Sequence, residues 1–375
     1  MASSSTTAAV AARARQDVVR LCHQGLPAIE LLGQVLARVR RVVPFDASFW
    51  SITDPATLLP TGGLVHNLPL ESCQPYFDQE LLVPDVNKFA DLAHAARPVG
   101  VLSRATGGDL HQSARYRALG EQLGLEDELR AAFVADGGCW GITALLRQKG
   151  TFAAREVDFL ADLAAHLAHG LRTALLAAAA KDGHGTPGTV VIDPAGQVEA
   201  VTPEAQRWMA ELTALTDRTG YPEQPTIPPV VYIVAARARA ALAGRDEGLP
   251  SARVRTRAGQ WLVVHGSLLS GPDGPDGRAA VVIEPARPAQ IAPVIVAAWQ
   301  LTGREQDVLR LVCRGLGTDQ IAQTLFLSPH TVRGYLKDLF AKVGVTSRGE
   351  LIARLFADHY HDQLIGTATI LHDPA

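Results

Sequence analysis

The sequence predicts an α+β, multidomain protein that ends in an all-α domain, and three observations lead to this prediction. The chain has 375 residues, enough for two or three domains of roughly 100–200 residues each. Residues 16–285 alternate amphipathic helical patterns with short runs of β-branched and aromatic residues, whereas residues 301–355 have helical periodicity alone. Hydrophobic residues make up 47% of the chain and charged residues 19%, which is typical of a globular protein and excludes collagen-like and wholly disordered classes.

The cysteines and the N-terminal residues indicate the cellular compartment of the protein. Cys22, Cys73, Cys139 and Cys313 lie far apart in the sequence, so no CxxC pair exists for zinc or redox chemistry and no disulfide framework is indicated. The first residues lack the basic and apolar regions of a secretory signal, and the longest apolar stretches are too short to span a membrane. We therefore expect a cytoplasmic protein with reduced thiols and no membrane partner.

The first block is expected to be a sensor-sized domain over residues 16–180, preceded by a disordered, Ala/Ser/Thr-rich tail over residues 1–15. Periodicity, β-branched runs and turn residues set its elements. In order, these are a helix over 16–43 with a break at 25–27, a strand over 45–53, short elements from 61 to 102, a helix over 114–123, a hairpin of 128–134 with 139–147, and a long helix over 152–180.

A second block over residues 186–285 follows a Gly- and Pro-containing linker at 181–188. The same signals give it an α+β order. Its expected elements are strands over 189–193 and 197–201, a helix over 203–215, an irregular Pro-rich stretch at 222–229, a helix over 232–243, and strands over 251–256, 260–269 and 278–283. A further linker is expected at residues 286–293.

The last block, residues 298–360, is expected to hold four short helices, with an unassigned tail over residues 361–375. Thr302 and Glu305 form a capping box that opens the first helix, and Gly315 ends it. The later boundaries are a second helix over 320–325, a tight turn at Phe326-Leu327, a third helix opened by Ser328-Pro329 and closed by Gly344, and a fourth opened by a second capping box of Ser347 and Glu350. A short helix, a tight turn and a longer helix make a helix-turn-helix.

The third helix has two chemically different faces. Apolar residues recur on one of them at a spacing of three and four: Val332, Leu336, Leu339 and Val343. The other face carries His330, Thr331, Arg333, Gly334, Lys337 and Lys342. Residues 299–360 hold eight basic and six acidic residues, although the whole chain has a net charge of −3. A mildly basic module on an acidic body suits contacts with phosphate.

This segment resembles the LuxR-type helix-turn-helix of bacterial transcription regulators. The residues that carry the resemblance run in order through about 55 positions: Leu301-Thr-x-Arg-Glu-x-x-Val-Leu309, Gly315-Leu, Ile321-Ala322, Leu325, Ser328-Pro-His-Thr-Val-Arg333, Lys342-Val-Gly-Val345 and Ser347-Arg348. The resemblance implies a four-helix domain whose third helix enters the major groove of double-stranded DNA and whose fourth helix pairs two protomers. It also implies a homodimer on an inverted-repeat operator and a contact with RNA polymerase.

Carried onto this chain, the resemblance places Arg333, Gly334 and Lys337 against bases. It places Thr318, Ser328, Thr331 and Lys342 against phosphates, and His330 completes the expected DNA-binding set. The chain departs from the family pattern in two places. The usual Ser, Asn, Lys and Glu are replaced here by Gly317, Thr318, Asp319 and Gln320, so an acid occupies a position that usually binds phosphate, and the frequent His of the third helix is Tyr335.

By the layout of their elements alone, the two preceding blocks resemble a GAF-like and then a PAS-like sensor domain. Neither contains the Asp/Asp/Lys pattern of a phospho-receiver, and the Trp/Tyr/Asp set of an acyl-homoserine-lactone pocket is also missing. We expect a small-molecule effector whose identity the sequence does not give. The apolar strands over 45–52 and 139–146 are the expected pocket walls, although a plain core is an alternative for both.

Other candidate motifs favour structural interpretations. Gly183-His-Gly-Thr-Pro-Gly188 spells GxGxxG but follows a helix and precedes a strand, the wrong order for a dinucleotide turn. His166 and His169 could face one metal, yet no third ligand accompanies them, and Cys139-Trp140 suits a buried strand better than a redox site. We therefore expect no catalytic site, no metal and no cofactor.

The prediction is a one-component, sequence-specific transcription regulator that is not an enzyme. A ligand-binding or enzymatic protein with a vestigial helix-turn-helix is the alternative, and exposure of Arg333 and Lys337 on one face would discriminate against it. A sigma-factor-like promoter reader is a second alternative, but the basic, aromatic melting helix that it needs is missing from the sequence.

Overall fold

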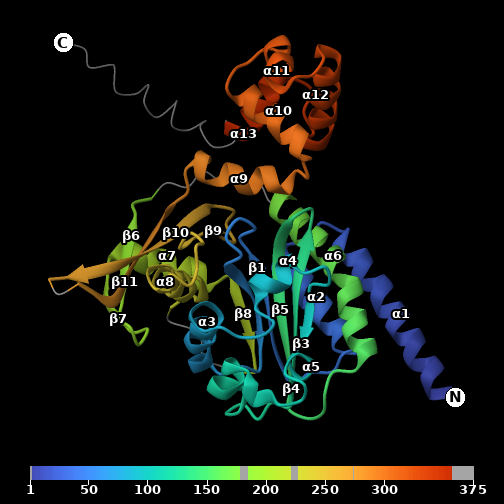
Figure 1. Ribbon diagram of the computed structural model, residues 1–375, viewed down its shortest axis with the longest axis vertical. Coiled ribbons are helices and arrows are strands. Elements are labelled where there is room, and N and C mark those ends of the chain that lie inside the picture. The colour runs from blue at the N-terminus through green and yellow to red at the C-terminus, as the bar shows by residue number, and fades with distance from the viewer. Residues whose placement is uncertain (1, 178–184, 221–226, 273, 357–375) are drawn as a thin grey trace. The chain divides into compact units, whose positions relative to one another are not determined.

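The computed structural model describes residues 2–177, 185–220, 227–272 and 274–356 (Figure 1). They form two compact units, one holding the described residues up to 285 and the other those from 286 onward. Half of the predicted linker at 181–188, most of the Pro-rich stretch at 222–229 and the whole predicted tail at 361–375 lie outside the described residues.

The first unit contains a six-stranded sheet with the order β3-β4-β5-β1-β2-β8. All neighbours are antiparallel except β2 and β8, which are parallel. The strands are β1 (Ala47–Thr53), β2 (Pro60–His66), β3 (Val99–Val101), β4 (Asp127–Ala135), β5 (Gly138–Arg147) and β8 (Thr216–Thr219). The predicted strand over 45–53 and the hairpin of β4 with β5 are thus present.

Helices cover both faces of this sheet. Figure 1 shows α1 (Ala2–Cys22), α2 (Ala28–Val39) and α6 (Ala154–Ala177) side by side on one face. The side chain of Trp50 packs against Phe133 on this face. Phe49, the preceding residue, packs on the other face against Phe89. That face carries α3 (Cys73–Leu82), α4 (Phe89–His94), α5 (Leu102–Ala105) and short helical turns at Leu70–Ser72, Leu110–Gln112 and Tyr116–Gly120.

The predicted disordered tail at residues 1–15 is wrong for the residues described, because α1 starts at Ala2. Alanine, the residue most favourable to helix, dominates this stretch. Further along α1, Ala14, Val18 and Leu21 are buried, and α1 packs against α6. The composition indicated disorder because it is polar and simple at its start, whereas the packing of the later turns stabilises one continuous helix.

A second, antiparallel sheet in the first unit has the order β7-β6-β11-β10-β9. Its strands are β6 (Gly188–Ile192), β7 (Val198–Val201), β9 (Ser251–Arg255), β10 (Trp261–Gly271) and β11 (Gly274–Pro285), with the helices α7 (Pro203–Thr213) and α8 (Pro229–Leu242). The helix α8 packs on β10 and β11. Read from its other edge, this sheet has the order β9-β10-β11-β6-β7. This matches the order β3-β4-β5-β1-β2 of the first sheet, when the strands of each block are counted from its first strand and β8 is left out.

The two blocks share a strand and a core. The strand β8 lies between α7 and α8 in sequence, yet it adds to the edge of β2 in the first sheet. Leu59 and Phe77 of the first block belong to the same hydrophobic cluster as Val231 and Val234 of α8. The sequence analysis missed β8, because four mostly polar residues carry no local pattern and the free edge of β2 supplies the pairing.

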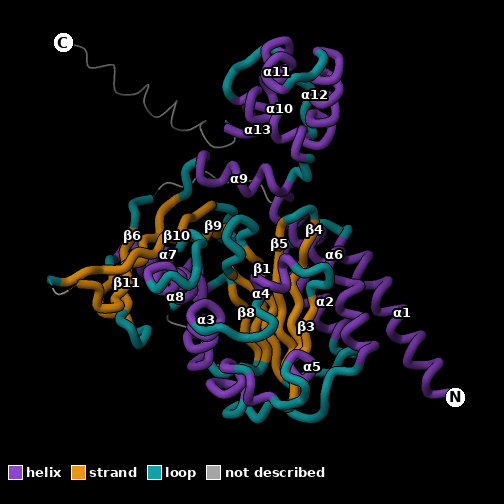
Figure 2. Tube along the Cα trace, viewed as in Figure 1, coloured by secondary structure: helices purple, strands orange, loops and turns teal. Residues whose placement is uncertain are grey.

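The second unit is all helical (Figure 2). It consists of α9 (Pro288–Ala298), α10 (Gly303–Cys313), α11 (Thr318–Leu325), α12 (Pro329–Val343) and α13 (Arg348–Phe356). The last four match the predicted helices. The linker predicted at 286–293 is wrong, because α9 occupies residues 288–298. Pro288 takes the first helical position, where no N–H is needed, and Ala292, Ile295 and Val296 pack against the core of this unit.

Candidate nucleic-acid interface

The turn between α11 and α12 is built by capping groups. The residue after the last turn of α11, Phe326, has φ +57°, and the N–H of Leu327 donates to the carbonyl of Ala322 at 2.9 Å, as in a Schellman ending. The side chain of Ser328 then accepts from the N–H of Thr331 at 3.0 Å. The two helices therefore meet in the geometry of a helix-turn-helix.

The second helix of the pair, α12, buries one stripe and exposes the other. Val332 and Leu339 are fully buried and Val343 nearly so, whereas Leu336 is half-buried. On the opposite side, the residues expected to meet DNA are exposed: His330, Thr331, Arg333, Gly334 and Lys337. Arg333 and Lys337, four residues apart on a helix, lie on one face, which is the discriminating observation that the sequence analysis asked for.

The cations of α12 differ from those of α10 in their partners. Arg304 and Arg310 both pair with Asp307 on α10, at 3.7 and 2.7 Å. Within the described part of the chain, neither Arg333 nor Lys337 forms an ion pair. Their charges are therefore available to a phosphate or to the edge of a base.

Gly334 stands between these two cations on the exposed face. No atom lies within 4 Å of the position that a Cβ would take there. A glycine inside an exposed helix costs about 1 kcal/mol relative to alanine, and packing within this unit gives no reason for it. The missing side chain lets another molecule approach the backbone of α12 closely.

Lys342, expected at a phosphate, makes contacts inside the second unit. Its ammonium group donates to Glu305 at 2.7 Å and to the carbonyl of Gln300 at 3.2 Å. Glu305 is buried and is also the capping-box acid, because its carboxylate accepts from the N–H of Thr302 at 2.6 Å. Lys342 thus ties the end of α12 to the start of α10, a role that the sequence analysis did not anticipate.

Burial alone would raise the pKa of the Glu305 carboxyl. The hydrogen bonds from Lys342 and Thr302 outweigh that effect and hold the pKa below its usual value. Glu305 is therefore an anion at neutral pH, and it compensates most of the positive charge that Lys342 would otherwise present to DNA.

The remaining expected phosphate contacts lie at helix starts. Thr318 is the first residue of α11 and is half-buried. Gly317 is the N-cap residue of α11, and its N–H donates to the side chain of Gln320 at 2.8 Å. Asp319 is exposed beside them. This acid favours the helix but repels a phosphate at the same helix end.

The fourth helix of the motif, α13, is largely committed to the core. Leu351 and Leu355 are buried, and Ile352 is half-buried. Its capping differs from the predicted box. Ser347 accepts from the N–H of Glu350 at 3.1 Å as expected, but the carboxylate of Glu350 reaches one residue further back, to Thr346 at 2.7 Å.

Comparison with known proteins identifies this unit. Residues 299–355 match the model of the family described as bacterial regulatory proteins, luxR family. An HTH-type transcriptional regulator of Mycobacterium tuberculosis is 48% identical over 52 residues, which are 14% of this chain and 6% of that protein. The spore germination protein GerE of Bacillus subtilis is 36% identical over 55 residues, 15% of this chain and 74% of GerE.

The chain belongs to the luxR family of bacterial regulatory proteins. The match is confined to the second unit, and it spans only a small fraction of the mycobacterial relative. Among solved structures, a VqmA–ligand–DNA complex covers 45% of this chain and 80% of its own, at 18% identity and a TM-score of 0.19. In this LuxR-family chain, α11 and α12 are the two helices of the helix-turn-helix.

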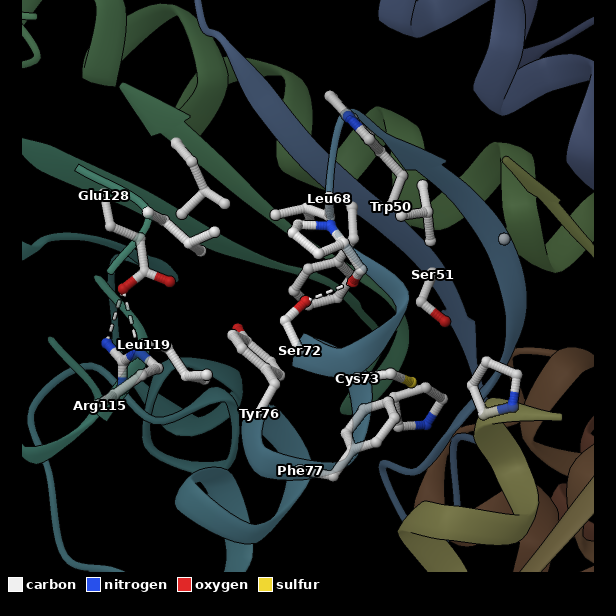
Figure 3. A pocket seen from close by; sticks show the side chains of 18 of the residues that line it. Trp50, Ser51, Leu68, Ser72, Cys73, Tyr76, Phe77, Arg115, Leu119 and Glu128 are labelled. Carbon is white, nitrogen blue, oxygen red and sulfur yellow. Dashed lines mark hydrogen bonds and ion pairs between the residues drawn. The ribbon is translucent and has the colours of Figure 1, made fainter. Parts of the chain in front are cut away.

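The first unit offers an apolar cavity of about 100 Å³ (Figure 3). Phe49 and Leu146, from the two strands expected to wall a pocket, line it, but Cys139 does not. Further lining comes from α3 and from β8, through Tyr76 and Arg218. The sequence analysis could not find these, because they are far apart in the chain and no periodicity links them.

The histidine and cysteine candidates do not form a metal or redox site. His23 approaches His169 and His166, with ring centroids 4.7 and 6.4 Å apart, but no group of three His, Cys, Asp or Glu side chains among the described residues could hold a metal ion. Cys139 is buried, and burial raises the pKa of its thiol to about 11. No helix in the described ranges is long and apolar enough to cross a membrane.

Proposed function

We propose that this protein is a sequence-specific DNA-binding transcription regulator and not an enzyme. The observation that carries the proposal is the exposed face of α12, where Arg333 and Lys337 keep their charges free of carboxylate partners within the described residues. Arg333, Gly334 and Lys337 read bases in the major groove. The DNA phosphates are contacted by Thr318, Ser328, His330 and Thr331. Lys342 contributes a weaker phosphate contact, because its ion pair with Glu305 compensates much of its charge.

The finer assignments belong to the same proposal. Residues 16–180 form a GAF-like sensor domain, residues 186–285 a PAS-like domain, and residues 298–360 the DNA-binding domain. The common strand order of the two sheets supports two related sensor folds. A small-molecule effector acts on them in a one-component, cytoplasmic regulator.

The assembled regulator is a homodimer on an inverted repeat, with a contact to RNA polymerase. The half-buried Ile352 of α13 supports a dimer contact, because it leaves part of that helix uncovered. Half-sites are then spaced by one helical turn of DNA or a multiple of it.

Selection from random DNA with the full chain tests the proposal. A single enriched inverted repeat is expected. Arg333→Ala should lower its affinity for that site by about 1–3 kcal/mol while leaving nonspecific binding nearly unchanged. An Arg304→Ala variant is the matched control, because Arg304 lies on α10 and pairs with Asp307. Equal specific binding by the wild type and an Arg333→Ala/Lys337→Ala variant would refute the proposal.

A further inference from the structure

The cavity of the first unit lies beside the first sheet, which includes the strand β8 added by the second block, and α3 and the turn at Tyr116–Gly120 supply the rest of its lining. Side chains that line it include Phe49, Leu64, Tyr76, Leu119 and Leu146, and β8 contributes Thr216 and Arg218. Most of this wall is hydrocarbon. An apolar cavity of about 150 Å³ takes benzene in another protein, so this cavity suits a small ring or a short chain.

One end of the cavity carries charges that already compensate one another. Figure 3 shows Arg115 and Glu128 together on one side, away from Cys73. The guanidinium of Arg115 donates to one oxygen of Glu128 at 2.8 and 3.0 Å and to Asp85 at 3.3 Å. Both Arg115 and Glu128 are more than nine-tenths buried. This end therefore has no net positive charge to offer a ligand.

Arg218 is the other cation of the cavity lining, and it differs from Arg115 in its partners. Its Nη2 donates to the carbonyl of Leu68 at 2.6 Å, while its Nε is buried without an acceptor. In the part of the chain that the structure describes, no carboxylate lies within ion-pair distance of it. A guanidinium with a neutral partner and an unused donor, beside an apolar space, favours an anion there.

The neighbouring side chains do not supply that anion. Cys73 is near Arg218, and burial raises the pKa of its thiol to about 12 against a smaller opposing effect of Arg218. The thiol is therefore neutral at physiological pH. The hydroxyl of Ser51 donates to the carbonyls of Ile52 and Gly62 at 2.9 Å, so it is engaged in the sheet.

We propose that the cavity binds a small apolar carboxylic acid as its anion, with the carboxylate against Arg218 and the hydrocarbon among Phe49, Leu119 and Leu146. A phosphate monoester fits less well, because its additional oxygens would meet hydrocarbon and lose their hydration. Because the ligand would touch β8, which comes from the second block, and also strands of the first block, its binding would join the two blocks. Its role as effector rests on the proposed function, whereas the binding itself does not.

Titration calorimetry of the full chain with phenylacetate and with its neutral counterpart phenylacetamide tests the proposal. Phenylacetate is expected to bind about ten-fold tighter or more, because only the carboxylate gains a charge-assisted hydrogen bond. Arg218→Met should bring the acid down to the affinity of the amide, and Arg218→Lys should keep a preference for the acid. Leu119→Trp, which fills the cavity, should weaken both probes alike.

Equal affinity of the wild type for both probes, or no binding of either at millimolar concentration, would overturn the proposal. The wild-type comparison needs no variant, so a poorly folding Arg218→Met protein would not obscure the outcome. DNA binding without any probe is measured separately. Loss of that binding would count against the proposed function and leave the carboxylate site standing.

Discussion

At the scale of single residues, Lys342 shows that a motif residue can have a structural role in place of the expected DNA contact. Its position in the LuxR pattern predicts a phosphate contact, yet in this chain it pairs with a buried acid at 2.7 Å. The sequence contains both residues but does not place them together, since 37 residues separate them. The exposed Lys337, without an ion pair in the described residues, is the natural comparison.

We expect Lys342→Met to destabilise the second unit by about 1–2 kcal/mol, less than a fully buried pair because the lysine is partly exposed. Lys337→Met should change stability by less than about 0.5 kcal/mol. Urea unfolding of residues 286–375, followed by the fluorescence of Trp299, measures both variants, since Trp299 is the only tryptophan in that range. Equal stability of the two variants would contradict the structural role of Lys342.

The same pair sets a pH dependence. The pKa of Glu305 is lowered in the folded state, so its stabilising contribution is complete above the unfolded pKa of about 4.3 and is lost as the pH falls below it. The difference in stability between the wild type and Lys342→Met should therefore shrink below about pH 4.3. A difference that stays constant down to pH 3 would show that Glu305 is not its source.

At the same scale, the sequence predicted the faces of a single helix better than contacts between distant parts of the chain. Arg333 and Lys337 could be placed on one face because helical periodicity is local. Arg218 could not be placed in a cavity, since its strand β8 pairs with an edge 153 residues earlier, Val65 against Arg218. Pairing over such a distance depends on the packing of both blocks, and no local pattern encodes it.

At the scale of elements, the helix boundaries of the second unit were predictable because capping chemistry is written in neighbouring residues. Thr302, Ser328 and Gly344 all act as the sequence indicates. The helix α9 was missed because its neighbouring residues indicate a linker and only tertiary contacts favour a helix. Pro288 and Pro293 suggest a linker, but tertiary contacts of Ile295 and its neighbours stabilise a helix in spite of Pro293.

Phe326 provides a test of the turn between α11 and α12. It adopts a left-handed conformation with φ +57° while its side chain is 96% exposed, so it has backbone strain and little packing in return. A left-handed non-glycine residue costs roughly 1–2 kcal/mol, of which glycine returns part as extra unfolded-state entropy. We expect Phe326→Gly to stabilise the second unit by about 0.5–1 kcal/mol.

Thermal unfolding of residues 286–375 measures this change as a rise in Tm of a few degrees. The matched control is Gly344→Ala, at φ +74° with no atom within 4 Å of the added Cβ, which should lower the Tm through backbone strain alone. A lower Tm for Phe326→Gly would mean that the aromatic ring packs in a way that its exposure does not suggest.

At the scale of the whole molecule, the two units differ in the sign of their net charge. Residues 1–285 hold an excess of four acidic residues, and residues 286–375 an excess of one basic residue. An acidic body tethered to a DNA-binding unit disfavours its approach to phosphate, and salt screens this effect. A ligand can relieve it only if the ligand binds two arrangements of the first unit with different affinity.

We therefore expect residues 286–375 to bind operator DNA about ten-fold more tightly than the full chain at low salt, with the difference shrinking as ionic strength rises. The fragment must begin before Arg287, because Arg287 is the N-cap of α9 and α9 belongs to the second unit. Fluorescence anisotropy at matched dimer concentration, over a series of salt concentrations, measures both proteins. An effector should alter the affinity of the full chain and leave that of the fragment unchanged. If the two proteins bind alike at every salt concentration, the first unit does not restrain the second by charge.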